Sequence, residues 1–248
     1  MIASARNAYI LKRLEETGII DYKSIAKELD VSEATVRRDF EKLEKNGQLR
    51  RVQGGAVKND EMIVGELSML AKNNVNAREK QSVASAAAQE VQDGERIYLD
   101  CGTSITPLAQ ILLKKKVHIV TNNSLILPYI TQQAAADVFL LGGRFSPADQ
   151  MVTGPLTENT LSTFTFNRCF IGCMGLDLAK KAVYVTDMEC LALKKMAMRN
   201  SEKTYLLLDA SKENKKGPFR LAEYTEFDVV YVNKSEHRKK YPDNFIVV

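Results

Sequence analysis

The stretch VSEATVRRDFEKLEKNGQLRRVQGGAV, residues 31–57, decides the fold of the first part of the chain. Ser32 can cap a helix with its hydroxyl, and the residues after it place Val36, Phe40 and Leu43 on one side of that helix. Polar and basic residues occupy the opposite side. The stretch therefore predicts a helix that packs on a core with one face and presents cations on the other.

A short hairpin is expected directly after this helix. Asn46-Gly47 is a turn signal, and the run QLRRVQGGAV, residues 48–57, alternates until Gly54-Gly55 interrupts it. Arg50 and Arg51 lie on the first strand of this hairpin. This pattern predicts a two-stranded wing that carries two arginines, although an ordinary surface hairpin would look similar.

Two more helices are expected upstream. Residues 6–17 have an apolar face and stop at Gly18, and Asp21 can cap a second helix whose apolar stripe ends at Leu29. Three short helices followed by a wing make a winged helix-turn-helix, whose last helix enters the major groove of DNA. We therefore expect residues 1–57 to form a DNA-binding domain.

The polar face of the third helix and the wing supply the expected contacts to double-stranded operator DNA. Residues near the start of a recognition helix reach base edges, and longer cations reach bases or phosphates. Residues 34–58 carry seven Lys and Arg against three Asp and Glu, while the whole chain has a net charge of only +4. A solvated basic helix could give the same count, so charge supports this assignment without deciding it. The expected DNA-contacting residues are Ser32, Glu33, Thr35, Arg37, Arg38, Lys42, Arg50 and Arg51.

Residues 31–56 resemble the signature of the DeoR family of bacterial transcription regulators, with the V-S-x-x-T-x-R-R-D core present from Val31 to Asp39. The resemblance implies a DNA-binding regulator with a second, effector-binding domain. Residues 58–77 show weak periodicity and read as a linker, and we expect residues 78–248 to form the effector-binding and oligomerisation domain.

Short apolar runs alternate with helical stretches in this larger part, which predicts an α/β domain with a mainly parallel sheet. The runs are RIYLD, KVHIVT, DVFLLGG, RCFIGCM, TYLLLD and DVVYV. Small and polar residues follow five of them, and the carboxyl ends of parallel strands are where such sheets bind ligands. Gly102 permits close backbone approach, Thr103 and Ser104 supply hydroxyls, and Lys212 supplies a charge. These groups favour an anion, although ordinary turn chemistry is the competing explanation.

The motifs DCGTS, TNN, LGGR, GCMGLD and LLLDASK are similar to successive motifs of the DeoR effector domain. That resemblance implies a fold like ribose-phosphate isomerases and a phosphorylated sugar or similar metabolite as effector, with no cofactor. Carried over by position, the effector-binding candidates are Asp100, Gly102, Thr103, Ser104, Thr121, Asn122, Gly143, Asp177 and Lys212.

Three functions are compatible with these parts. The leading hypothesis is a repressor of a sugar utilisation operon that a phosphorylated sugar controls, and an activator with the same parts is the alternative. A sugar-phosphate isomerase is the rival enzyme, but we find no lysine-glycine-rich loop of the kind those isomerases carry. We expect no enzymatic activity.

The remaining expectations concern cysteines, compartment and assembly. The C-x3-C pair of Cys169 and Cys173 fits no common zinc spacing, so we expect reduced thiols without a metal or disulfide. No apolar run reaches the roughly 18 residues of a membrane helix, which predicts a cytoplasmic protein without a membrane partner. A dimer or tetramer is expected because one recognition helix covers only one half-site.

Overall fold

A computed structural model describes residues 3–45, 48–52, 54–57, 69–234 and 241–248. The chain divides into two compact units, Met1–Val75 and Asn76–Val248, and each is described by itself. The turn expected at residues 46–47 and most of the expected linker, residues 58–68, lie outside the described residues. The rest of that linker contains helix α4 (Met69–Asn74).

The small unit has the three helices and the wing that the sequence predicts. Its helices are α1 (Ala3–Thr17), α2 (Tyr22–Leu29) and α3 (Glu33–Lys45), and its strands are β1 (Ile19–Asp21), β2 (Arg50–Val52) and β3 (Gly55–Val57). The Asp21 carboxylate accepts a hydrogen bond from the Ser24 N–H, which caps α2 as expected. Strand β1 was not expected, and it pairs with β3 to make a three-stranded antiparallel sheet.

A buried cluster holds the three helices together, and it contains the apolar residues that define their faces. Val36 and Phe40 of α3 are fully buried, and the rings of Tyr22 and Phe40 lie 5.0 Å apart. The Asp39 carboxylate, 3% exposed, pairs with the Arg6 guanidinium at 2.7 Å and so connects α3 to α1. The packing therefore determines which side of α3 remains exposed.

The large unit is built on a parallel sheet, which confirms the predicted α/β class. Within the described residues this sheet has seven strands in the order β15-β14-β12-β9-β4-β5-β6, and every neighbouring pair is parallel. Its strands are β4 (Arg96–Leu99), β5 (His118–Thr121), β6 (Asp137–Leu140), β9 (Phe166–Gly172), β12 (Ser201–Leu208), β14 (Val229–Val232) and β15 (Phe245–Val247). The six apolar runs account for six of the strands, and β15 was not expected.

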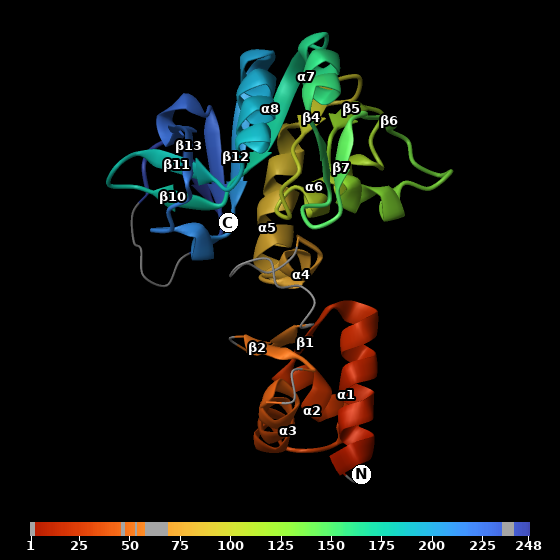
Figure 1. The fold of residues 1–248 in the computed structure, drawn as a ribbon. Helices are drawn as coiled ribbons and strands as arrows, with labels where there is room; N and C mark the ends of the chain where they lie inside the picture. The colour runs from red at the N-terminus through yellow and green to blue at the C-terminus, as the bar shows by residue number, and fades with distance from the viewer. Residues whose placement is uncertain (1–2, 46–47, 53, 58–68, 235–240) are drawn as a thin grey trace. The chain divides into compact units, whose positions relative to one another are not determined.

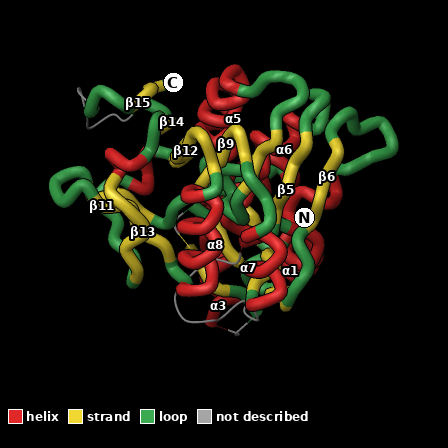
Figure 2. Tube along the Cα trace, turned by 90° about the horizontal axis from the view of Figure 1, so that it is seen from above, coloured by secondary structure: helices red, strands yellow, loops and turns green. Residues whose placement is uncertain are grey.

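Helices cover both faces of this sheet. Figure 2 shows α5 (Ala77–Ala87) and α6 (Thr106–Leu112) on one side, and α7 (Pro155–Ser162) and α8 (Met188–Arg199) on the other. Each face has its own buried cluster, one including Ala109 and the other including Leu193. Because both faces are covered, the buried parts of the central strands are continuous apolar runs that do not alternate: residues 97–99, 119–120, 169–171 and 205–208.

Two smaller sheets complete the unit. One joins β10 (Gly175–Asp177), β11 (Ala182–Val185) and β13 (Phe219–Glu223), and the other joins β7 (Arg144–Ser146) and β8 (Met151–Thr153). No helix in the described part of the chain is long and apolar enough to cross a membrane.

Candidate functional site

The exposed face of α3 presents two unpaired cations. Arg38 and Lys42 lie one helical turn apart and are both exposed. Neither side chain has a hydrogen bond or ion pair with any group in the described part of the chain. Their charges are therefore available to a polyanion, as expected for a surface that binds DNA.

The other arginines of this surface already have partners. The Arg37 guanidinium lies 4.9 Å from the centroid of the Tyr22 ring. Arg51 pairs with Glu44 and with Glu41, each at 2.8 Å. Because these carboxylates offset its charge, we expect Arg51 to contribute less to DNA affinity than Arg38.

The start of α3 uses its hydroxyls to cap the helix. The Thr35 N–H donates to Ser32 Oγ at 3.2 Å, and the two hydroxyl oxygens lie 2.9 Å apart. Glu33 lies in the first turn of α3. Arg50 is half-buried on β2, and its Nε has no hydrogen-bond partner among the described groups. The eight expected DNA-contacting residues thus lie on α3, its cap and the wing, and their contacts to DNA remain a prediction.

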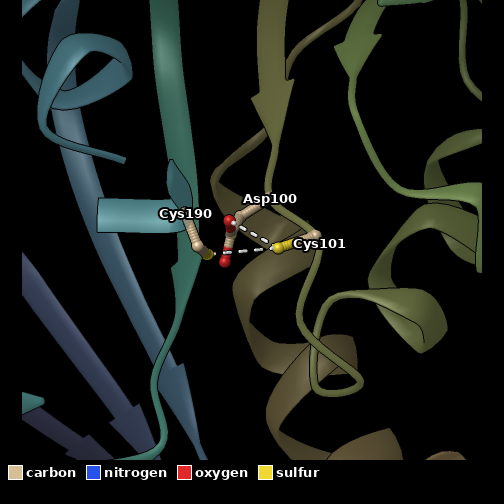
Figure 3. A group of neighbouring side chains, drawn as sticks. All are labelled: Asp100, Cys101 and Cys190. Carbon is tan, nitrogen blue, oxygen red and sulfur yellow. Dashed lines mark hydrogen bonds between the residues drawn. The ribbon is translucent and has the colours of Figure 1, made fainter. Parts of the chain in front are cut away.

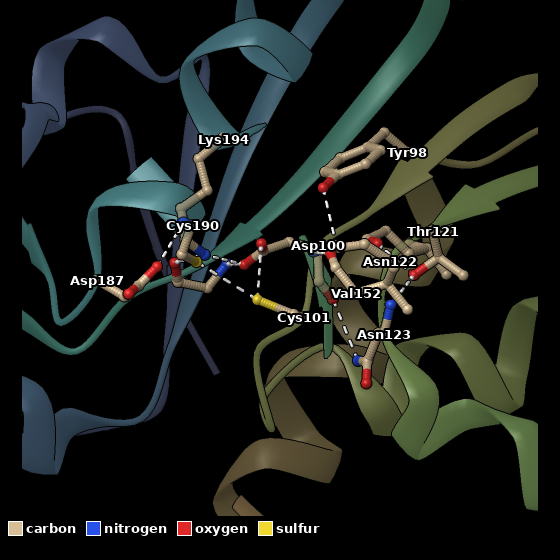
Figure 4. Close-up of polar contacts among 12 residues, drawn as sticks. Tyr98, Asp100, Cys101, Thr121, Asn122, Asn123, Val152, Asp187, Cys190 and Lys194 are labelled. Carbon is tan, nitrogen blue, oxygen red and sulfur yellow. Dashed lines mark hydrogen bonds and ion pairs between the residues drawn. The ribbon is translucent and has the colours of Figure 1, made fainter. Parts of the chain in front are cut away.

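In the large unit, polar side chains gather where the parallel strands end. Asp100 follows β4, Thr121 ends β5 and Asn122 follows it, and Asp209 follows β12. Strand β9 separates β12 from β4, and β5 lies beside β4, so these ends meet at one edge of the sheet. Figure 4 shows the part of this edge around Asp100.

Asp100 is held by a buried ion pair. Its Oδ2 accepts hydrogen bonds from the Lys194 ammonium of α8 and from the Gly172 N–H, the latter at 2.9 Å. Lys194 also donates to the Gly172 carbonyl at 3.0 Å. Burial disfavours the ammonium, but the Asp100 carboxylate and two neighbouring thiols outweigh it and raise the pKa of Lys194. This pair ties β4, β9 and α8 together.

Thr121 and Asn122 are fully buried, and their side chains bond within the chain. Thr121 Oγ1 donates to the Leu99 carbonyl at 2.6 Å, and Asn122 accepts from the Tyr98 hydroxyl at 3.0 Å and donates to the Val152 carbonyl at 3.1 Å. These two expected site residues therefore position the strand ends in this structure and present no free polar atom at the edge.

The loop between β4 and α6 carries hydroxyl groups that have no hydrogen-bond partner among the described residues. Gly102 packs against Gly172, where an added Cβ would lie 3.2 Å from the Gly172 Cα. The Thr103 and Ser104 hydroxyls have no hydrogen-bond partner among the described residues. Thr106, the first residue of α6, has a buried Oγ1 that is also without a partner there.

Asp209 carries the second unsatisfied atom of this edge. It is 1% exposed, and its Oδ1 accepts from Ser211 and, at 2.9 Å, from the Asn76 amide. Its Oδ2 is buried without a hydrogen-bond partner among the described groups. A buried carboxylate oxygen without a donor costs free energy, so this atom favours a ligand that brings a hydroxyl or N–H group.

Lys212 ends the 3₁₀ turn η4 (Ala210–Lys212) and is half-buried. Its ammonium makes no ion pair within the described residues. Burial raises the pKa of the Cys173 thiol to about 12, although the positive charges of Lys212 and Lys194 act to lower it. Both ammonium groups therefore act on the same end of β9.

Gly143 follows β6 at the same edge of the sheet, and Asp177 is next to Leu176, which pairs with Glu213 directly after Lys212. Gly143 has φ +148°, and a Cβ there would lie 2.1 Å from Thr157 Oγ1, so packing alone explains the glycine. Asp177 ends β10 in the small sheet and accepts the Lys180 N–H at 3.0 Å. Their role in effector binding remains a prediction without support from these contacts.

Comparison with known families covers both units. Residues 6–62 match the DeoR-like helix-turn-helix domain, and residues 75–234, more than half of the chain, match the DeoR C terminal sensor domain. The chain belongs to the DeoR family. It is therefore a transcription regulator with a DNA-binding domain and a sensor domain, as its motifs imply. Its relatives are also named as regulators.

DeoR-family relatives align along most of the chain. The uncharacterised HTH-type transcriptional regulator YulB of Bacillus subtilis is 30% identical over 212 residues, covering 86% of this chain and 81% of the relative. The lactose phosphotransferase system repressor of Streptococcus mutans is 31% identical, covering 83% and 82%. The L-fucose operon activator of Haemophilus influenzae is 27% identical, covering 96% and 93%.

Solved structures give a weaker likeness. Ribose 5-phosphate isomerase A of Methanocaldococcus jannaschii is 17% identical, with 56% of this chain and 55% of that chain covered and a TM-score of 0.41. We draw no functional argument from a likeness at this level.

Five residues of the site were not among the expected ones: Asn76, Thr106, Asn123, Lys194 and Asp209. Asn123 Nδ2 donates to the Asp100 carbonyl at 3.2 Å, and its place directly after a strand was a signal. Lys194 also had a signal, because it falls on the buried stripe of α8 with Cys190 and Leu193. Asn76 had none, since its partner Asp209 is 133 residues away.

Proposed function

We propose that this DeoR-family protein is a cytoplasmic repressor of a sugar utilisation operon, and that a phosphorylated sugar binds at the carboxyl edge of the large sheet and controls its DNA binding. In this proposal residues 1–57 bind DNA, and residues 78–248 bind the effector and form the assembly, as the sequence predicts. Dimers or tetramers place recognition helices on paired half-sites.

The observation that carries the proposal is the position of unsatisfied polar atoms. Among the described residues of the large unit, the buried side-chain atoms without a hydrogen-bond partner are Thr106 Oγ1 and Asp209 Oδ2. Both lie at the edge where the parallel strands end. Because folded proteins pair nearly all buried polar atoms, their coincidence at one edge supports a polar ligand there.

The chemistry of the neighbouring groups supports a sugar phosphate in particular. Asp209 Oδ2 is an acceptor that a sugar hydroxyl can satisfy. The Lys212 ammonium and the hydroxyls of Thr103 and Ser104 are donors that suit phosphate oxygens. A neutral sugar would leave the lysine charge without a counterion, so the phosphorylated form fits the site better.

The names of the relatives support carbohydrate control and leave the sign of regulation to experiment. Lactose phosphotransferase repressors and a fucose operon activator align with similar identities. A repressor loses operator affinity or its ability to block transcription when the effector binds, whereas an activator with the same parts stimulates transcription from its operator. A reporter gene behind the operator, with the regulator present or deleted, separates these two outcomes.

A thermal-shift screen of the full chain tests the effector. Phosphorylated sugars and their unphosphorylated counterparts are compared at matched concentration, because a ligand that binds only the folded state raises its apparent stability. We expect stabilisation by a phosphorylated sugar and none by the matching free sugar. Equal shifts with both members of each pair would contradict the phosphate assignment, and no shift across a broad panel would contradict the sugar-phosphate class. The same panel followed for isomerisation tests the enzyme alternative.

A further inference from the structure

Two cysteines that are 89 residues apart in the chain meet beside Asp100. Cys101 follows Asp100 in the loop after β4, and Cys190 lies in the first turn of α8. Their sulfur atoms are 3.4 Å apart, and the Cys101 thiol lies 3.5 Å from Asp100 Oδ1. Figure 3 shows the three side chains pointing toward one another.

These side chains offer a compact set of metal ligands. One ligand atom from each residue lies within 4.8 Å of the others, and all three residues are buried. In a tetrahedral zinc site with Zn–S bonds of about 2.3 Å, two sulfurs lie about 3.8 Å apart. The sulfurs need to separate by only a few tenths of an ångström to bind such an ion.

The two oxygens of Asp100 have different surroundings. Oδ2 is occupied by the Lys194 ammonium and the Gly172 N–H. Oδ1 has only the Cys101 thiol as a hydrogen-bond partner among the described groups. The oxygen that faces the sulfurs is therefore the one that can bind a metal without breaking the ion pair.

The local charges balance when a divalent metal is present. Two thiolates and one carboxylate carry three negative charges, and a divalent cation and the Lys194 ammonium carry three positive charges. A buried cluster with a net charge would be costly, whereas this one is neutral. Lys194 thus neutralises the site while remaining outside the metal's ligands.

An apolar cluster is the simpler explanation for buried thiols. Cys101, Cys190 and Met151 form such a cluster, and free cysteines often behave as small apolar residues. That explanation accounts for burial but not for the approach of a carboxylate oxygen to the same point. With protonated thiols the Asp100–Lys194 pair is neutral without a metal as well, so the observation that favours an ion is the position of the Asp100 carboxylate beside both sulfurs.

We propose that Cys101 Sγ, Cys190 Sγ and Asp100 Oδ1 bind a thiophilic divalent cation, zinc by preference, with a fourth position for water or another oxygen ligand. The metal would join the loop of Gly102 to the first turn of α8. This site is separate from the C-x3-C pair, and it shares Asp100 with the sheet edge of the proposed effector site.

Cobalt titration of the reduced, metal-free full chain tests the site. Cobalt(II) bound by thiolates gives a charge-transfer absorption in the near ultraviolet, and the intensity of its visible bands reports four-coordination. We expect one cobalt per chain, displaced by zinc. Absence of the charge-transfer band in the wild-type protein would overturn the proposal.

Serine variants locate the metal. Cys101→Ser and Cys190→Ser should each lose the wild-type spectrum and weaken zinc binding tenfold or more in competition with a chromophoric chelator. Cys169→Ser and Cys173→Ser are matched controls, because these thiols lie outside the cluster, and both should bind as the wild type does. If the cobalt spectra of Cys101→Ser and Cys190→Ser both match that of the wild type, the metal binds elsewhere and the proposal is wrong.

X-ray absorption at the zinc edge needs no variant, so it decides the matter even if a serine variant fails to fold. The wild-type protein should show two sulfur ligands at about 2.3 Å and the remaining ligands as oxygen. A first shell that contains only nitrogen and oxygen would contradict the assignment.

Discussion

Lys212 is half-buried at the end of the turn after β12 and has no ion pair among the described residues. If its ammonium binds the effector phosphate, Lys212→Met removes a charged hydrogen bond worth about 1.5–3 kcal/mol. Effector affinity should then fall by about 10- to 150-fold. Operator affinity without effector should stay the same, because Lys212 belongs to the large unit.

Calorimetric titration of the effector and anisotropy with labelled operator DNA measure the two quantities. Lys180→Met is the control, since Lys180 is exposed and only its backbone N–H bonds to Asp177. If both methionine variants bind the effector as the wild type does, Lys212 is not a phosphate ligand.

Arg38 and Arg51 form a second residue-scale comparison, between a free guanidinium and a paired one. Arg38→Ala should weaken operator binding by about 1–3 kcal/mol if it makes a good base contact. Arg51→Ala should cost less, because Glu41 and Glu44 already offset the charge of Arg51. Lys12→Ala, an exposed change on α1, serves as the control.

Anisotropy titrations at several salt concentrations measure this ranking for specific and unrelated DNA. A base contact by Arg38 predicts a larger loss on the operator than on unrelated DNA. A loss for Arg51→Ala as large as that for Arg38→Ala would show that the carboxylates release Arg51 when DNA binds.

At the scale of elements, the wing is held by a close backbone approach. A Cβ at Gly55 would lie 2.0 Å from the Ile20 carbonyl oxygen, so Gly55→Ala forces β3 away from β1. We expect destabilisation of this sheet by about 1–3 kcal/mol. Hydrogen exchange of the amides in residues 19–21 and 55–57 should accelerate, with Lys23→Ala as a surface control. Unchanged protection would mean that β1 is not part of the stable sheet.

The sequence predicted most of these elements for local reasons. Asp21 and Ser32 cap their helices through hydrogen bonds that span three residues, and six apolar runs became six parallel strands. The strands that were not predicted have three to five residues each: β1, β7, β8, β10, β11, β13 and β15. Such short segments carry too little periodicity to be distinguished from turns.

At the scale of the whole molecule, Asn76 connects the proposed effector site to the junction of the two units. It is the first residue of the large unit, and its amide donates to Asp209 Oδ1 at 2.9 Å and to Ser211 Oγ at 3.0 Å. A ligand that engages Asp209 competes with or reorients these bonds. Asn76 is therefore placed to pass a change at the sheet edge into the connecting chain.

Asn76→Gly should reduce the coupling between effector and operator. Asn76 has a left-handed conformation, φ +53°, so glycine keeps the backbone while removing the amide. We expect the effector to change operator affinity by a smaller factor than in the wild type, while operator affinity without effector changes little, because Asn76 belongs to the large unit. Anisotropy titrations with and without effector give this factor, and Gln81→Ala on α5 is the control. If the effector changes the operator affinity of Asn76→Gly by the same factor as in the wild type, Asn76 does not transmit the effector signal.

The sequence by itself determined the helix caps, the winged domain, the parallel α/β class and the edge of the sheet where polar groups collect. Caps, periodicity and strand-end residues depend on neighbours a few positions apart, so they can be read along the chain. Only the tertiary structure decided that Lys194 lies against Asp100, that Cys190 meets Cys101 and that Asn76 reaches Asp209. These pairs are 89 to 133 residues apart, and they form because the sheet order β12-β9-β4 and the packing of α8 bring distant strand ends to one place. For the same reason the buried, unpaired oxygens of Thr106 and Asp209 could be assigned to one edge only after the strands had been ordered.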